Sequence, residues 1–118
     1  MDIETAARAL AELGNITRLQ IVRLLVRAGE EGLAIGEVQA HLGLPASTLA
    51  FHLRGLVAAG LVAQRRQGRV IRCTPNYAAL RETLAFVTEH CCAGVAAAPT
   101  PSGSEAPSAT CRLQAGAG

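Results

Sequence analysis

The residues with the clearest potential for chemistry are the cysteines near the end of the chain. Cys91 and Cys92 are adjacent, and Cys111 follows 19 positions later. Thiolates are soft ligands for metals and metalloids, and they also undergo reversible oxidation. Cys91 and Cys92 could therefore bind one soft ion, with Cys111 as the third ligand. One alternative is that the pair are buried apolar residues of a helix stripe. Another is that the pair bind the ion while Cys111 is only a tail residue, and glutathione or a partner-subunit thiol completes the site.

Three other side chains with metal-binding or catalytic potential have simpler interpretations. Cys73 shares parity with Ile71 on a predicted strand, so we expect it in the core. His90 could bind zinc beside the cysteines, whereas His41 is expected on the solvated surface. His90 cannot activate Cys91 as a nucleophile, because consecutive side chains on a helix do not face one another. Since the sequence has no phosphate-binding loop and no carboxylate cluster, we predict that the protein is not an enzyme.

The second chemical feature is a concentration of arginine between residues 46 and 74. This stretch contains no Asp or Glu, although the whole chain has a net charge of only +2. Its arginines are Arg54, Arg65, Arg66, Arg69 and Arg72. They could form a solvated hairpin face, but the absence of compensating acids favours contact with an anionic partner, namely nucleic-acid phosphates or a minor groove.

The same stretch begins with a predicted helix that follows Pro45 and ends at Gly60. Ser47 and Thr48 provide an N-cap-like start. The apolar stripe at helical spacing consists of Leu49, Leu53, Leu56 and Val57. The positions farthest from that stripe are Ser47, Ala50, Phe51 and Arg54, with Thr48 and His52 on the flank. A buried stripe opposite hydroxyl, aromatic and basic side chains suits a DNA major groove, although packing would explain His52 equally well.

A basic hairpin is predicted directly after this helix. Residues 61–66 and 69–74 form two short apolar and basic runs joined at Gln67-Gly68. The candidate DNA contacts on the hairpin are Arg65, Arg66, Gln67, Gly68 and Arg69. A helix followed by a basic hairpin is the outline of a winged helix-turn-helix.

The remaining elements complete that outline. Apolar periodicity predicts helices over 3–13 and 17–28, the latter at the core, and a short third helix from Ile35. A fifth helix is predicted from Tyr77 to about Cys92 and should end by Gly94. Its apolar stripe consists of Tyr77, Leu80, Leu84, Val87 and Cys91. We therefore predict a mainly α fold with a β-hairpin wing that dimerises through its first and last helices.

Composition also predicts the domain organisation and the compartment. Residues 1–92 form the DNA-binding and dimerisation domain, and 93–118 form a flexible tail rich in Ala, Gly, Pro and Ser that carries Cys111. No apolar run of about 18 residues predicts a membrane span. The N-terminus differs from a secretory signal, so we expect a cytoplasmic protein with reduced thiols.

Two segments carry a family resemblance. LGNITRLQIVRLL (13–25), followed by STLAFHLRGLVAAGLVAQRRQGRVIR (47–72), resembles the ArsR/SmtB family of winged-helix repressors over about residues 5–92. The resemblance implies a homodimer that binds an inverted repeat in its own promoter and is released by a metal or metalloid. It also implies DNA contacts from Ser47, Thr48, Ala50, Phe51 and Arg54, and wing contacts from Arg65 to Arg69.

The cysteine positions narrow the resemblance. The third helix, IGEVQAHL, lacks the cysteine pair of many arsenic-responsive members, and 77–92 lacks the Asp and His pairs of zinc-responsive ones. Cys91-Cys92 is similar to the arsenite-responsive subset with C-terminal cysteines. This resemblance implies that arsenite, methylarsenite or antimonite binds Cys91, Cys92 and Cys111 and induces an arsenic-resistance operon. The alternative is a thiol redox or persulfide-sensing repressor, in which Cys111 forms the disulfide because adjacent cysteines would make a strained one.

Overall fold

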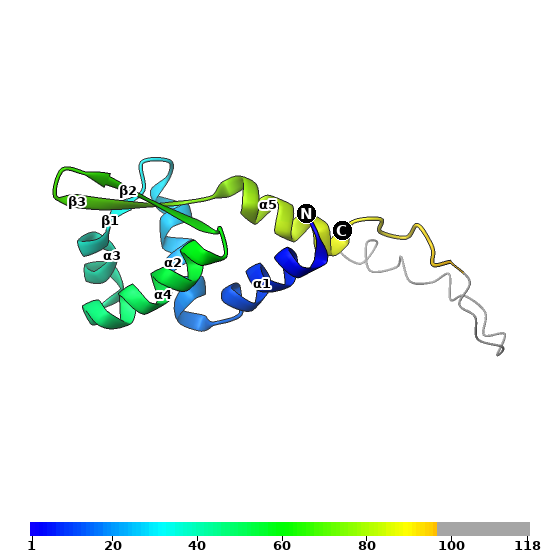
Figure 1. The fold of residues 1–118 in the computed structure, drawn as a ribbon, viewed down its shortest axis with the longest axis horizontal. Helices are drawn as coiled ribbons and strands as arrows, with labels where there is room; N and C mark the ends of the chain where they lie inside the picture. Colours follow the sequence, from blue (N-terminus) through cyan, green and yellow to red (C-terminus); the bar gives the residue numbers. More distant parts are fainter. Residues whose placement is uncertain (97–118) are drawn as a thin grey trace. The chain divides into compact units, whose positions relative to one another are not determined.

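A computed structural model of the chain describes residues 1–96. The chain divides into two units, Met1–Val87 and a second unit that begins at Thr88. The elements of the described part follow one another as shown in Figure 1. Their bounds are α1 Ile3–Leu13, α2 Ile16–Ala28, β1 Leu33–Ala34, α3 Ile35–Leu42, α4 Ala46–Ala58, β2 Val62–Gln67, β3 Val70–Pro75 and α5 Tyr77–Thr88. The predicted mainly α fold with a hairpin wing is confirmed. None of the helices in residues 1–96 is long and apolar enough to cross a membrane.

The helices α1 and α2 begin at side chains that cap them. The Asp2 carboxylate accepts the backbone N–H of Thr5 at 2.8 Å, and the Asn15 side chain accepts that of Arg18 at 3.1 Å. The first N–H groups of a helix have no partner within the helix, so each cap stabilises its helix and defines where it starts. Two helices can therefore follow one another with only Gly14 and Asn15 between them.

The core lies where α2, α3, α4 and the sheet meet, and α2 is the central helix, as predicted. The buried cluster consists of Ala9, Ile21, Val22, Leu25, Val38, Leu49, Leu53, Leu56, Leu61, Val62 and Cys73. One member of the predicted α4 stripe is not buried, because Val57 is 38% exposed. Val57 lies about 100° around the helix from Leu56, at the edge of the stripe. It therefore faces outward beside the wing.

The sheet contains a strand that periodicity did not predict. The two-residue strand β1 pairs antiparallel with β3, which also pairs with β2, in the order β1-β3-β2. The close approach requires Gly32, which is buried with φ +69°, because a Cβ there would overlap the carbonyl oxygen of Cys73 and lie 2.6 Å from Thr74 Cγ2. The wing is thus attached to the loop that follows α2.

The hairpin turn lies one residue later than predicted. Gln67 pairs with Val70, so the two-residue connection is Gly68-Arg69 and not Gln67-Gly68. Two-residue turns that suit the twist of a hairpin need positive φ at their first central residue, and Gly68 has φ +61°. The glycine therefore determines the turn position.

The helix α5 ends at Thr88, earlier than the predicted end near Cys92. The cause is the backbone of the next residues, since His90 and Cys92 have φ values of +63° and +62°. Left-handed residues cannot continue a right-handed helix. Cys91 consequently does not lie on the helical stripe to which its spacing assigned it, and Gly94 does not end the helix.

Candidate DNA-binding surface and thiol site

The face of α4 opposite the core is exposed along its length, as the helical spacing predicted. Ser47, Ala50, Phe51 and Arg54 are exposed, whereas Thr48 and His52 are half-buried. The predicted N-cap was wrong: Pro45 occupies that position, and no side chain caps the helix. Ser47 lies within the first turn, so its hydroxyl is available to solvent or to a partner. We call Ser47, Ala50, Phe51 and Arg54 the reading face.

His52 lies at the border between the reading face and the interior. Its ring packs edge-on against Phe51, with centroids 5.3 Å apart and planes inclined at 67°. Its Nδ1 atom is shielded from solvent and has no hydrogen-bond partner in the described part of the chain. Of the two roles considered for His52, this placement supports packing more than base contact.

A groove of about 460 Å³ separates α4 from the wing. Ala50, Arg54 and Val57 line its helix side, and Gln64 and Ile71 line its wing side. The helix and the hairpin thus border one concave surface, which we call the helix–wing groove. Arg54 contributes a positive charge to it directly.

The strand register determines which wing arginines face the groove. Cross-strand partners share a face of the sheet, and successive residues alternate between faces. Arg66 pairs with Ile71, which lines the groove, so Arg66 shares the groove face. Arg65 pairs with Arg72 on the opposite face. Gln67, Gly68 and Arg69 form the exposed tip between the strands.

Arg72 has a structural role within the chain. Its Nε donates to the carbonyl of Glu31 at 3.0 Å, and its Nη2 donates to that of Gly32 at 3.3 Å. These bonds connect the second wing strand to the loop before β1. The positive charge that the sequence placed in residues 46–74 is therefore only partly available to an anionic partner.

A cluster of three residues from different helices supports the reading face from behind. Arg18 Nε lies 3.2 Å from Glu12 Oε1, and the two side chains are only 18% and 22% exposed. The Arg18 guanidinium also lies over the Phe51 ring, 5.8 Å from its centroid. Sequence reasoning missed this cluster, because no periodic pattern relates α1, α2 and α4 to one another.

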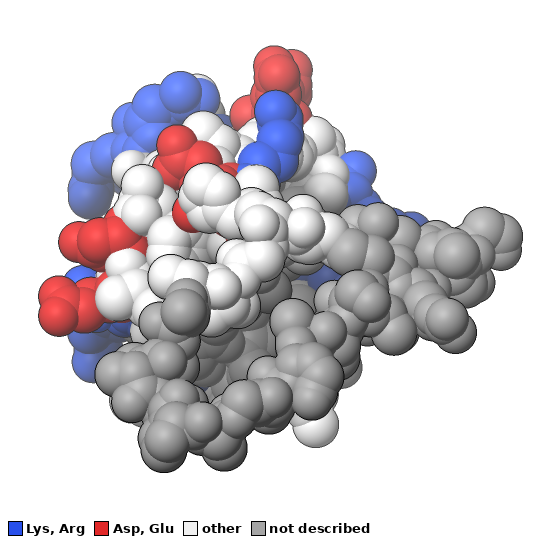
Figure 2. Space-filling view, turned by 90° about the vertical axis from the view of Figure 1, so that its right-hand side faces the viewer, with Lys and Arg blue, Asp and Glu red and all other residues white. Residues whose placement is uncertain are grey.

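Apolar side chains remain exposed on α1 and α5. Ile3 and Leu10 of α1 are 71% and 39% exposed, and Leu84 and Val87 of α5 are 61% and 59% exposed. Figure 2 views the molecule from the end at which α1 and α5 lie, and uncharged surface occupies much of the described part of that view. The first half of the α5 stripe packs within the chain, where Leu80 contacts the core.

The two adjacent cysteines lie beyond α5, in the second unit. Both are exposed, and their Sγ atoms are 3.4 Å apart. Cys91 keeps its thiol, whereas Cys92 is disulfide-bonded in this structure. Because thiolate bonds to an ion such as zinc are about 2.3 Å long, both sulfurs are close enough to bind one ion once Cys92 is reduced. Residues 1–96 contain no group of three or more His, Cys, Asp or Glu side chains arranged to hold a metal. Cys111 lies outside the described residues.

The structure also places two other side chains that could bind a soft ion, His90 and Cys73. His90 Nε2 lies 3.8 Å from Glu89 Oε1, an ion pair only when the imidazole is protonated. Cys73 is fully buried, as predicted, and burial raises the pKa of its thiol, which the Gln64 side-chain hydrogen bond at 3.8 Å partly opposes. Cys73 is therefore a core residue.

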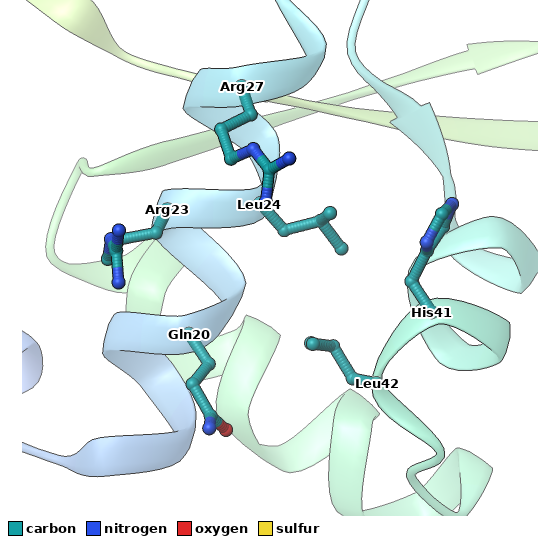
Figure 3. A pocket seen from close by; sticks show the side chains of 6 residues that line it. All are labelled: Gln20, Arg23, Leu24, Arg27, His41 and Leu42. Atoms are coloured by element: carbon teal, nitrogen blue, oxygen red, sulfur yellow. The ribbon is translucent and has the colours of Figure 1, made fainter.

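A separate pocket of about 280 Å³ lies between α2 and α3. Figure 3 shows Leu24 and Leu42 pointing toward one another across it, with Arg27 and His41 at its edge. His41 is exposed, as predicted. The pocket lining contains no thiol, so it offers a soft ion no suitable ligand.

A helix-turn-helix with its reading face beside a basic wing defines a winged-helix DNA-binding regulator. A helix-turn-helix domain model matches residues 13–65. The ArsR2 protein of Halobacterium salinarum, provisionally named an arsenical resistance operon repressor, is 32% identical over 82 residues, which cover 68% of each chain. The chain belongs to the ArsR/SmtB family of winged-helix transcriptional regulators, whose members are DNA-binding proteins and not enzymes.

Solved structures agree with this assignment. An ArsR-like transcriptional regulator from Rhodococcus sp. RHA1 is 30% identical, with a TM-score of 0.65 over 76% of this chain and 81% of that one. The homodimeric winged helix-turn-helix domain of Mb0332 from Mycobacterium bovis is 27% identical, with a TM-score of 0.61 over 75% and 82% of the two chains. The fold and its wing are thus those of known regulators.

Proposed function

We propose that the protein is a homodimeric repressor that binds an inverted-repeat operator and leaves it when trivalent arsenic or antimony binds its C-terminal thiols. The observation that carries the DNA-binding part is the helix–wing groove. It presents the exposed reading face of α4 beside Arg66 of the wing, in a stretch without any acidic residue. Arginine contacts to phosphate position a protein on the duplex, and a helix in the major groove reads the bases.

The dimer is supported by the exposed apolar residues of α1 and α5. Ile3, Leu84 and Val87 are each more than half exposed, which is costly for large apolar side chains unless a partner covers them. The similar domain of Mb0332 from Mycobacterium bovis is homodimeric. In a symmetric dimer, two copies of α4 would lie about one duplex turn apart, and each would read one half of an inverted repeat.

The inducer part of the proposal depends on Cys91 and Cys92. Their sulfurs are 3.4 Å apart and exposed, so once Cys92 is reduced a small thiophilic centre could reach both without rearrangement of the core. Two thiolates suffice for a methylated arsenic species, whereas arsenite or antimonite would take Cys111 as the third ligand. The name of the Halobacterium relative provides independent support for an arsenical inducer.

Coupling between the two sites is explained by the position of the cysteines in the chain. They follow the last turn of α5, the helix that we place at the dimer interface. A ligand that reorders residues 89–92 would change how the two α5 helices pack, and hence the spacing of the two reading faces. A coupling free energy of about 1–3 kcal/mol would change operator affinity about 5- to 150-fold.

The test is an anisotropy titration of the DNA upstream of the gene, with arsenite, methylarsenite, antimonite, zinc and cadmium added to the complex. Cys91→Ser and Cys92→Ser should bind the operator like wild type but resist release by arsenite. Cys111→Ser should abolish release by arsenite and spare release by methylarsenite. Cys73→Ala is the matched control, since that thiol is buried, and it should be released normally. Normal release of Cys91→Ser would refute the site.

The alternative function is thiol redox or persulfide sensing by the same residues. It is favoured by the state of the two cysteines: Cys92 is disulfide-bonded in the structure, and Cys91 is an exposed thiol, the kind that oxidants reach. Mass spectrometry of the peroxide-treated protein distinguishes the two. A disulfide that includes Cys111, together with loss of operator affinity, would favour redox sensing. If the treated protein is unmodified and keeps its operator affinity, redox sensing is excluded.

A further inference from the structure

Phe51 is an unusual residue for the centre of a surface that contacts DNA. Its side chain is 56% exposed, although it has no polar atom to offer to a base or to a phosphate. It lies on the reading face between Ser47 and Arg54, and its neighbour Ala50 is also apolar and exposed. The middle of the reading face is therefore an apolar patch between a hydroxyl and a guanidinium.

The aromatic ring is held in place from behind. The Arg18 guanidinium lies over the ring at 5.8 Å from its centroid, and His52 packs against it edge-on. Arg18 is itself held by Glu12, and the atoms that join them, Arg18 Nε and Glu12 Oε1, are shielded from solvent. A cation over the ring stabilises its position, so little side-chain freedom remains to be lost when Phe51 meets a partner.

The absence of a side chain at Gly55 makes this support possible. A Cβ at Gly55 would lie 2.5 Å from Glu12 Oε1, so the Glu12 carboxylate rests directly against α4 one turn after Phe51. Glu12 of α1 and Arg18 of α2 thus form a charged support beside the ring, and Gly55 of α4 leaves the space that Glu12 occupies. This support matters because the side chain that it restrains is exposed to solvent.

The major groove offers one apolar group to such a side chain, the C5-methyl group of thymine. We propose that Phe51 determines operator specificity by contacting a thymine methyl in each half-site, and that Arg18 and Glu12 are positioning residues for its ring. This inference rests on the proposed DNA-binding function of α4. Ser47 and Arg54 on either side would supply hydrogen bonds to neighbouring bases or phosphates.

The test compares two versions of the same upstream fragment, one synthesised with thymine and one with uracil, which lacks only the methyl group. Burial of one methyl group changes affinity about fourfold. With one contact in each half-site, the wild-type dimer should bind thymine DNA about 15-fold more tightly than uracil DNA, from the product of the two effects. Phe51→Ala should bind both fragments equally, and Phe51→Tyr should keep the wild-type preference.

Two further variants separate positioning from folding. Arg18→Met combined with Glu12→Gln removes the guanidinium, keeps the aliphatic stem and leaves no shielded carboxylate unpaired, so the thymine preference should fall while the melting temperature changes much less than in Arg18→Met alone. Arg54→Ala is the matched control on the reading face, and it should weaken binding to both fragments by the same factor. Unchanged thymine preference in Phe51→Ala, or no preference in wild type, would overturn the inference. Failure of wild type to prefer either fragment over random duplex would refute the proposed function instead.

Discussion

The attachment of the wing to the rest of the fold can be tested at Gly32. Its φ of +69° places it in the left-handed region, and a Cβ there would overlap the Cys73 carbonyl oxygen and crowd the Thr74 side chain. Gly43 has a similar φ of +65°, but nothing lies within 4 Å of where its Cβ would be. The two glycines therefore share a conformational requirement and differ in their packing.

The expected loss of stability can be estimated from these contacts. A left-handed alanine costs about 1–2 kcal/mol at either position. At Gly32 the overlap also forces β1 away from β3, which removes backbone pairing and the Arg72 bonds to the carbonyls of Glu31 and Gly32. Hydrogen bonds contribute about 1 kcal/mol each in net terms, so the added loss is about 2–3 kcal/mol. We expect Gly43→Ala to lose about 1 kcal/mol and Gly32→Ala about 4 kcal/mol.

Urea unfolding followed by circular dichroism measures this difference. Both variants and wild type must be compared at one protein concentration, because the stability of a dimer depends on concentration. A loss of about 4 kcal/mol relative to wild type is a large part of the 5–15 kcal/mol typical of a small protein, so Gly32→Ala should be partly unfolded at moderate temperature. If the two variants lose stability equally, β1 does not pair closely with β3 and the reasoning fails.

Three further predictions follow from the site and its supports. Arg66→Ala should reduce the salt dependence of operator binding by about one phosphate contact in each half-site, a change of about 1.8 in the log–log slope for the dimer, whereas Arg65→Ala on the opposite face should change it less; equal slopes would contradict the strand register. The Cys73 thiol should resist a thiol reagent in the folded protein and react only after unfolding or at a pH above that of an ordinary thiol, because burial raises its pKa and keeps it protonated; a thiol count in native buffer and in urea checks this. Asn15→Ala should lower the free energy of unfolding by about 1 kcal/mol, since α2 loses its N-cap bond to the Arg18 N–H. A loss no larger than that of an alanine substitution at an exposed surface position would count against the cap.

The sequence alone determined the elements whose signals are local. The α4 stripe, the reading face opposite it and the core position of α2 follow from apolar periodicity, and the hairpin follows from two short runs around a glycine. The predicted burial of Cys73 was confirmed, because strand parity is also a local property. The resemblance carried by residues 13–25 and 47–72 then indicated the family, which the comparisons confirmed.

Only the tertiary structure decided which distant residues meet. The pairing of Leu33 with Cys73, the bonds from Arg72 to the loop after α2, and the support of Phe51 by Arg18 and Glu12 each join segments that no periodicity relates. The end of α5 was also mispredicted, because the apolar helical spacing continues past Thr88 to Cys91, whereas the backbone of His90 is left-handed. Such features depend on steric fit and on partners far along the chain, which a local pattern cannot encode.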